Sequence, residues 1–260
     1  MQEIIFEKRI SKGSRFNQIY IPKEMEKSLG VGDLVEVRLL QKSFQIYYKN
    51  QQKLSEFKEY LITGIFSALI PFTEIKSVFI VGSFLDEIAY NDIDLVIISE
   101  KEDLEKGIET LLAEKFSQKF HIIALSEEKL NSLMEKDPLT CSMLTSYASN
   151  RKAGLNYKRT IDKAHIEFLL MMPEDLLELN LPSKSFYDGI RRLITIENFL
   201  KNEKIDRKII NNQVEKAITN KLFDKIKSKG IITQEETVHL RKIIKEKLTE
   251  IKRLLDGQKR

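Results

Sequence analysis

The chain has 260 residues, which is long for one domain and suits two or three. Hydrophobic residues make up 42% and charged residues 32%, a composition typical of a folded, soluble chain. The single cysteine, Cys141, excludes a disulfide framework and a cysteine-based zinc site. No apolar run approaches the ~18 residues of a membrane span, and the N-terminus lacks a signal-peptide pattern. We therefore expect a cytoplasmic protein with no membrane partner.

The net charge of +4 is unevenly distributed along the chain. Residues 1–50 carry +3, residues 51–200 carry −7 and residues 201–260 carry +8. Basic ends around an acidic middle favour polyanion binding by the ends and cation binding in the middle. The alternative is that all three segments have solvated surfaces whose charges have no binding role, and that the uneven distribution is chance variation.

The first fifty residues predict a small β-rich domain with one helix. Alternation of apolar and polar side chains predicts four strands, at 2–10, 17–21, 34–40 and 43–49. Pro22 suits the first turn of a helix over 22–30, and Gly30 ends it. The polar residues 49–53 form the first candidate linker.

Residues 10–37 carry a recognisable motif. Its elements are Lys12-Gly13, Ile21-Pro22-Lys23-Glu24, Leu29-Gly30 and Gly32-Asp33 followed by Val35 and Val37. This run resembles the AbrB/MazE/SpoVT family of swapped-hairpin DNA-binding domains, and the resemblance covers nearly all of residues 4–48. It implies a homodimer in which two chains interleave strands and present basic loops to double-stranded DNA.

Five basic side chains are the candidate DNA-binding residues of this segment. Lysine and arginine at such positions neutralise phosphates, and the candidates are Lys8, Arg9, Lys12, Arg15 and Lys23. The alternative is a module that only dimerises the protein, with these charges on a solvated face.

From residue 55 the periodicity changes to an alternation of helices and strands. Helices are predicted at 55–70, 103–118 and 126–136, with Ser55 and Ser126 as N-caps. Buried strands are predicted at 76–82, 92–98 and 119–125. This order indicates an α/β or α+β domain.

The segment 78–98, VFIVGSFLDEIAYNDIDLVII, is the most informative part of the chain. One apolar strand leads into Gly82-Ser83, and the next begins with Asp92 and Asp94, which share a face because they are two residues apart. Mg²⁺ is usually held by one or two carboxylates together with substrate phosphates. Glycine allows close approach of a phosphate, and the serine hydroxyl and amide donate to it.

This pattern resembles the nucleotidyltransferase superfamily related to DNA polymerase beta, in its small, minimal members, over about residues 55–150. The resemblance implies that Gly82 and Ser83 bind the phosphates of an NTP. It also implies that Asp92 and Asp94 are catalytic ligands of Mg²⁺ or Mn²⁺.

The chain departs from the superfamily pattern at two positions. Phe84 stands where a basic residue often follows the serine, and His121 lies on the strand that usually carries a third carboxylate. A neutral imidazole can act as a base or as a softer metal ligand, so His121 is a further candidate catalytic residue. The alternative is a histidine that the strand accommodates without a catalytic role.

After about residue 155 the pattern is helical. Helices are predicted at 161–172, 183–203, 206–229 and 233–256, with Ser183 and Asp206 as caps and Gly230 as a stop. Thr233 and Glu236 fit a capping box. We expect a helical bundle that binds a substrate, a protein or an RNA.

Basic side chains recur along the last two predicted helices. They would line a nucleic-acid groove or, equally, form salt bridges with neighbouring glutamates: Lys221, Lys225, Lys227, Lys229, Arg241, Lys242, Lys245, Lys247, Lys252 and Arg253.

The sequence thus predicts an α+β multidomain protein. Its parts are an AbrB-like domain at 1–50, an α/β nucleotidyltransferase-like core with a mixed sheet at 51–154, and a helical domain at 155–260. The first functional hypothesis is a DNA-associated nucleotidyltransferase that uses a Mg-NTP. The second is a DNA-binding regulator or antitoxin-like protein with a non-catalytic nucleotidyltransferase domain, and the third is a structural adaptor.

Overall fold

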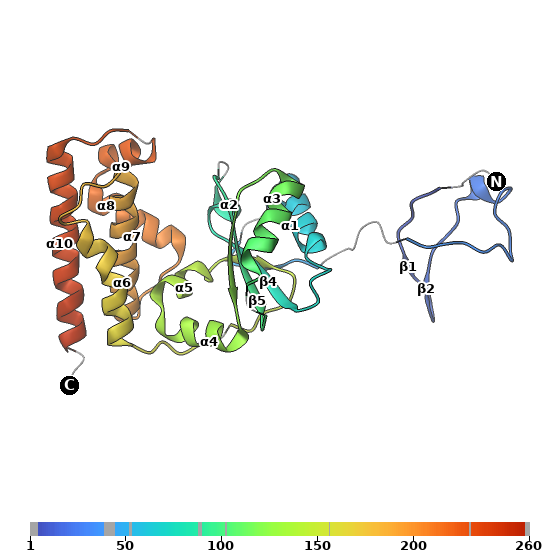
Figure 1. The fold of residues 1–260 in the computed structure, drawn as a ribbon, viewed down its shortest axis with the longest axis horizontal. Coiled ribbons are helices and arrows are strands. Elements are labelled where there is room, and N and C mark those ends of the chain that lie inside the picture. The colour runs from blue at the N-terminus through green and yellow to red at the C-terminus, as the bar shows by residue number, and fades with distance from the viewer. Residues whose placement is uncertain are drawn as a thin grey trace. The chain divides into compact units, whose positions relative to one another are not determined.

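The computed structural model describes residues 5–38, 45–51, 54–87, 90–101, 103–155, 157–228 and 230–257. Contacts between residues divide the chain into two units, Met1–Lys42 and Ser43–Arg260. The second unit holds a five-stranded sheet and a bundle of helices (Figure 1). Within the described ranges, no helix combines the length and the apolar composition that a bilayer span requires.

The first unit contains one short antiparallel hairpin. Its strands are β1 (Ser11–Lys12) and β2 (Asn17–Gln18), with Lys12 opposite Asn17. The Gly13 amide donates to the Phe16 carbonyl oxygen at 3.0 Å and closes the turn.

Three predictions for this unit are wrong over the residues described. Positions 5–10 and 34–38 form no strand beyond this hairpin, and the helix predicted at 22–30 is reduced to the 3-10 turn η1 (Lys23–Met25). The physical reason is burial, because an isolated hairpin needs further strands or a helix to cover its apolar face. Every described hydrophobic side chain here is exposed or only half-buried, and the large exposed ones are Ile5, Ile10, Phe16, Ile19, Tyr20, Ile21, Val31, Leu34, Val35 and Val37.

The sheet of the second unit has the strand order β3-β7-β4-β5-β6. The strands are β3 (Tyr47–Lys49), β4 (Ile75–Val81), β5 (Ile93–Ser99), β6 (Phe120–Leu125) and β7 (Tyr147–Ser149). Strands β5 and β6 are parallel and the other paired strands are antiparallel, so the predicted α+β class with a mixed sheet is confirmed.

Strand β3 was predicted as part of the N-terminal domain, and it lies instead at the edge of this sheet. Tyr48 is opposite Ala148 of β7. A three-residue strand carries too little pattern to identify its partner, and the partner here is about a hundred residues away. The unit boundary after Lys42 accordingly falls before the predicted boundary at 50.

Helices cover both faces of the sheet. One face packs against α1 (Glu56–Ala68) and α3 (Glu105–Phe116), and the other packs against α4 (Glu127–Lys136). Alternate residues of β4 and β5 enter the two cores, as the period of a strand requires. The predicted N-caps are confirmed, since Ser55 and Ser126 each accept from the amide three residues later.

The bundle consists of α6 (Lys163–Asp175), α7 (Ser183–Leu200), α8 (Arg207–Ile218), α9 (Asn220–Lys227) and α10 (Gln234–Gly257). The predicted capping box is confirmed, because the Glu236 amide donates to Thr233 Oγ1 at 3.2 Å and the Thr233 amide donates to Glu236 Oε2 at 2.6 Å. The Asp206 cap is confirmed as well. The single helix predicted over 206–229 is wrong, because Thr219 adopts φ of 67° and divides it into α8 and α9.

Of the two other end signals in the bundle, the Ser183 cap differs from prediction and the Gly230 stop is confirmed. Ser183 is the first residue of α7 rather than its N-cap, and Pro182 occupies the cap position without a side-chain bond. Gly230 lies beyond the last residue of α9, and its amide donates back to the Lys225 carbonyl at 2.8 Å.

The bundle and the sheet domain pack together through α5 (Pro138–Met143). Cys141 of α5 is fully buried against Phe199 of α7 and Ile205, the residue before the cap of α8. This contact holds the start of α8 close to the sheet, in agreement with the single unit Ser43–Arg260 (Figure 1).

Candidate functional site

The candidate site lies where β4 ends and β5 begins. The two strands are antiparallel with Val81 opposite Asp94, so Gly82 and Asp94 meet at one edge of the sheet, and Asp92 directly precedes β5. Gly82 has φ of 81° and ψ of −158°, a region that is essentially restricted to glycine. A Cβ at this position would overlap Oδ2 of Asp94. Glycine is therefore required both by the turn and by the packed carboxylate.

The residues after Gly82 form a short turn of helix, α2 (Ser83–Asp86), that is anchored in the core. Phe84 is fully buried and contacts Tyr90 edge-to-face with ring centroids 4.9 Å apart. Lys58 of α1 lies over the Phe84 ring at 5.3 Å and donates to the Glu87 carbonyl at 2.7 Å. Phe84 thus fixes the turn and leaves it without a cation of its own.

Asp94 and His121 are brought together by the parallel pairing of β5 and β6. They are register partners, and His121 Nδ1 lies 3.3 Å from Asp94 Oδ1. Burial, followed by the charge of Asp92, raises the pKa of Asp94, while the contact with His121 opposes this shift. The His121 side chain is 64% exposed, so its ring is accessible from solvent.

The donor chemistry at this edge fits a hard divalent cation. Asp92 and Asp94 offer as many carboxylates as Mg²⁺ usually takes from a protein. In the described part of the chain, no three His, Cys, Asp or Glu side chains gather in a way that would hold a metal ion. Phosphate oxygens would have to complete the coordination.

Arg207 is close to this edge, and the sequence analysis did not identify it. Its guanidinium Nη2 lies 2.8 Å from Glu87 Oε1, and Nη1 lies 3.9 Å from Asp86 Oδ2. The charge of Arg207 is among the influences that lower the pKa of Asp94. Arg207 follows the Asp206 cap, and no local motif distinguishes it from the other basic residues of the bundle.

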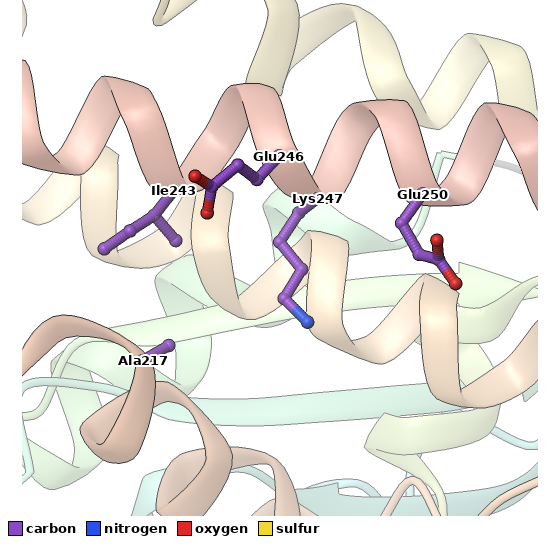
Figure 2. A pocket seen from close by; sticks show the side chains of 5 residues that line it. All are labelled: Ala217, Ile243, Glu246, Lys247 and Glu250. Carbon is purple, nitrogen blue, oxygen red and sulfur yellow. The ribbon is translucent and has the colours of Figure 1, made fainter.

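Two adjoining hollows lie elsewhere, on the bundle. One has a volume of about 290 Å³ and is lined by Ala217 of α8 and by four side chains of α10 (Figure 2). The other, of about 330 Å³, contains Glu197, whose carboxylate accepts from Lys201 at 2.5 Å and from Lys247 at 2.6 Å. Acidic and basic side chains alternate in this lining, so it favours neither an anion nor a cation.

Many of the basic side chains predicted to form a stripe on the last helices have acidic partners. Lys225 contacts Glu236 at 2.6 Å and Lys252 contacts Glu174 at 2.7 Å. Arg241 donates instead to backbone carbonyls at the end of α6, including that of Leu176 at 3.1 Å. Lys229 lies outside the described residues. These contacts favour the salt-bridge interpretation of the stripe over a nucleic-acid groove.

The five candidate DNA-binding side chains are all exposed in the first unit. Lys12 belongs to β1, Arg15 lies in the turn of the hairpin and Lys23 begins η1. Lys8 and Arg9 precede β1. Lys12 and Arg15 therefore belong to the same hairpin, one in a strand and the other in its turn.

Comparison with known proteins identifies no relative of this chain. The chain matches no protein-family model, no curated protein and no solved structure.

Proposed function

We propose that this protein is a DNA-associated nucleotidyltransferase that transfers a nucleotidyl group from a Mg²⁺-bound NTP to an acceptor. The observation that carries the proposal is the meeting of Gly82, Asp94 and His121 at one edge of the sheet. A positive-φ glycine lets a phosphate approach the backbone, and a pair of carboxylates attracts a divalent cation.

Each group at this edge has a chemical role in the proposed reaction. The acceptor forms a bond to the α-phosphorus while the bond to pyrophosphate breaks. Mg²⁺ bound to Asp92 and Asp94 would neutralise phosphate charge. The Ser83 hydroxyl donates to a phosphate oxygen, and His121 in its neutral form accepts the proton of the acceptor.

Calorimetric titration of each NTP with Mg²⁺ tests this proposal. The wild type should bind, and the variant Asp92→Asn/Asp94→Asn should lose the Mg²⁺-dependent binding. The matched control is Glu109→Gln/Glu114→Gln, which removes two exposed carboxylates from α3 and should bind as the wild type does. A wild type that binds no NTP, or an aspartate variant that binds equally well, contradicts the proposal.

The N-terminal unit is proposed to bind double-stranded DNA as a homodimer. Val31 and Leu34 are fully exposed, and a unit of this size cannot bury its hydrophobic side chains alone. Large exposed apolar groups indicate a protein partner, and a second copy of the same unit would cover them. We therefore expect Val31→Lys/Leu34→Lys to dissociate the dimer in sedimentation velocity. Ile231→Lys, which changes an equally exposed side chain before α10, should not.

The salt dependence of duplex binding tests the DNA contact. Each phosphate contact that is lost reduces the slope of log K against log salt by about 0.9. Lys12→Ala/Arg15→Ala should therefore flatten the slope, and Lys242→Ala/Lys245→Ala on α10 should leave it unchanged. Equal slopes in all three proteins would place the contact away from the hairpin.

A second candidate function is a DNA-binding regulator, or antitoxin-like protein, whose nucleotidyltransferase domain binds nucleotide without turnover. His121 in the place of a third carboxylate favours it, together with the lack of a three-ligand group among the described residues. NTP that is bound and recovered intact, with no modified protein or nucleic acid by mass spectrometry, would support this candidate. The bundle would then serve as a binding surface for a protein or an RNA.

A further inference from the structure

Arg207 connects the helical bundle to the turn that follows Gly82. It is the first residue of α8, and its side chain is only 18% exposed. Its two Nη groups lie 2.8 Å from Glu87 Oε1 and 3.9 Å from Asp86 Oδ2. Because α2 ends at Asp86, the guanidinium lies beside the segment that positions Ser83.

The charge around Arg207 is unbalanced. Asp86, Glu87, Asp92 and Asp94 place four carboxylates on this short stretch, and among the described residues Lys58 is a second cation in contact with it. Lys58 already has partners, since its Nζ donates to the Glu87 carbonyl and lies over the rings of Phe84 and Tyr90. A bound polyphosphate would therefore need another cation.

Arg207 has the capacity to supply that positive charge. Its carboxylate partner Glu87 is 51% exposed, so water can solvate this carboxylate when the guanidinium leaves it. Its Nε is buried and has no acceptor among the described residues. A guanidinium also presents paired N–H groups that match two phosphate oxygens.

We propose that Arg207 is a polyphosphate-binding residue of this site, and that its guanidinium exchanges the carboxylate of Glu87 for the terminal phosphates of an NTP. The inference rests on the proposed nucleotidyltransferase function. The turn after Gly82 carries Phe84 in place of a basic side chain, and the bundle supplies the positive charge through Arg207. The nucleotide site is then completed by two parts of the unit, β4–β5 and the start of α8.

The test compares the binding of ATP, ADP and AMP with Mg²⁺ by calorimetry. A lost charge-assisted hydrogen bond to phosphate corresponds to about a 10- to 100-fold weaker affinity. Arg207→Ala should therefore weaken ATP binding by about that factor and change AMP binding less than about twofold. Arg207→Lys keeps the charge without the fork and should give an intermediate loss. Lys208→Ala, the exposed neighbour on α8, is the matched charge control and should bind as the wild type.

A second variant separates phosphate binding from a purely structural ion pair. Glu87→Gln removes the carboxylate partner and frees the guanidinium, so ATP should bind as tightly as before or more tightly. If Arg207 only fastens the bundle to the turn, Glu87→Gln and Arg207→Ala will weaken ATP and AMP binding alike, and the inference is overturned. If the wild type binds no nucleotide, both this inference and the proposed function are overturned. If the wild type binds nucleotide and Arg207→Ala keeps the same ratio of ATP affinity to AMP affinity, this inference alone is overturned.

Discussion

Substitution of Gly82 by alanine is the sharpest test of the site geometry. The backbone at Gly82 has φ of 81° and ψ of −158°, which costs a non-glycine residue about 1–3 kcal/mol. The new Cβ would also overlap Oδ2 of Asp94, so the carboxylate must turn away. We expect Gly82→Ala to reduce the free energy of unfolding by about 2 kcal/mol and Tm by about 4–8 °C, and to abolish Mg²⁺–NTP binding.

Differential scanning calorimetry with two companion variants measures this effect. Gly107→Ala changes a glycine in α3 whose Cβ would meet no atom within 4 Å, and it should leave Tm unchanged or raise it slightly. Asp94→Ala removes the group that the Cβ overlaps. The double variant Gly82→Ala/Asp94→Ala should therefore be more stable than the sum of the single effects predicts, because only the φ strain remains.

Two results would refute this reasoning. A Gly82→Ala protein with the Tm of the wild type would mean that the turn relaxes without cost. Additive effects of Gly82→Ala and Asp94→Ala would mean that the glycine and the carboxylate are not in contact.

Three further predictions concern the packing and the charges of the second unit. Burial raises the pKa of the Cys141 thiol to about 12, so iodoacetamide at pH 8 should label it only after unfolding; rapid labelling of the native protein would contradict its burial between α5 and α7. Thr233→Ala removes the capping box of α10 and should reduce the free energy of unfolding by about 1 kcal/mol, whereas Thr249→Ala within the same helix should have little effect. Burial alone would raise the pKa of Glu197, but the bonds from two lysines outweigh it and lower that pKa. The ionised Glu197 therefore stabilises the fold above pH 4.5, and this stabilisation is lost as the pH falls below that value. We expect Glu197→Gln to be about 1–2 kcal/mol less stable than the wild type at pH 7. In urea unfolding, the variant should also lack the part of the pH dependence that Glu197 causes.

The sequence predicted those features that depend on residues close together in the chain. Caps at Ser55, Ser126 and Asp206 were predictable because each side chain bonds an amide three residues later. The approach of Gly82 and Asp94 was predictable for a related reason: they end and begin two consecutive antiparallel strands. The neighbouring position of His121 required only that the third strand pair in parallel with the second.

Features that depend on distant parts of the chain were missed. The pairing of β3 with β7 joins segments about a hundred residues apart, and neither strand exceeds three residues. The division between α8 and α9 at Thr219 follows from a positive φ at a threonine, which no propensity indicates. Arg207 was missed because its partners, Asp86 and Glu87, lie 120 or more residues earlier in the chain.

The uneven charge along the chain is partly explained by these distant contacts. Part of the excess positive charge of the C-terminal helices is paired with acidic residues earlier in the bundle, as with Lys247 and Glu197 or Lys252 and Glu174. Arg207 differs, because its partners Asp86 and Glu87 lie outside the bundle and adjoin the residues proposed to hold metal and phosphate. A polyphosphate carries more negative charge than Glu87 and offers the guanidinium two oxygens in the geometry it prefers. The same arginine that joins the bundle to the turn is therefore the group proposed to exchange its carboxylate partner for phosphate.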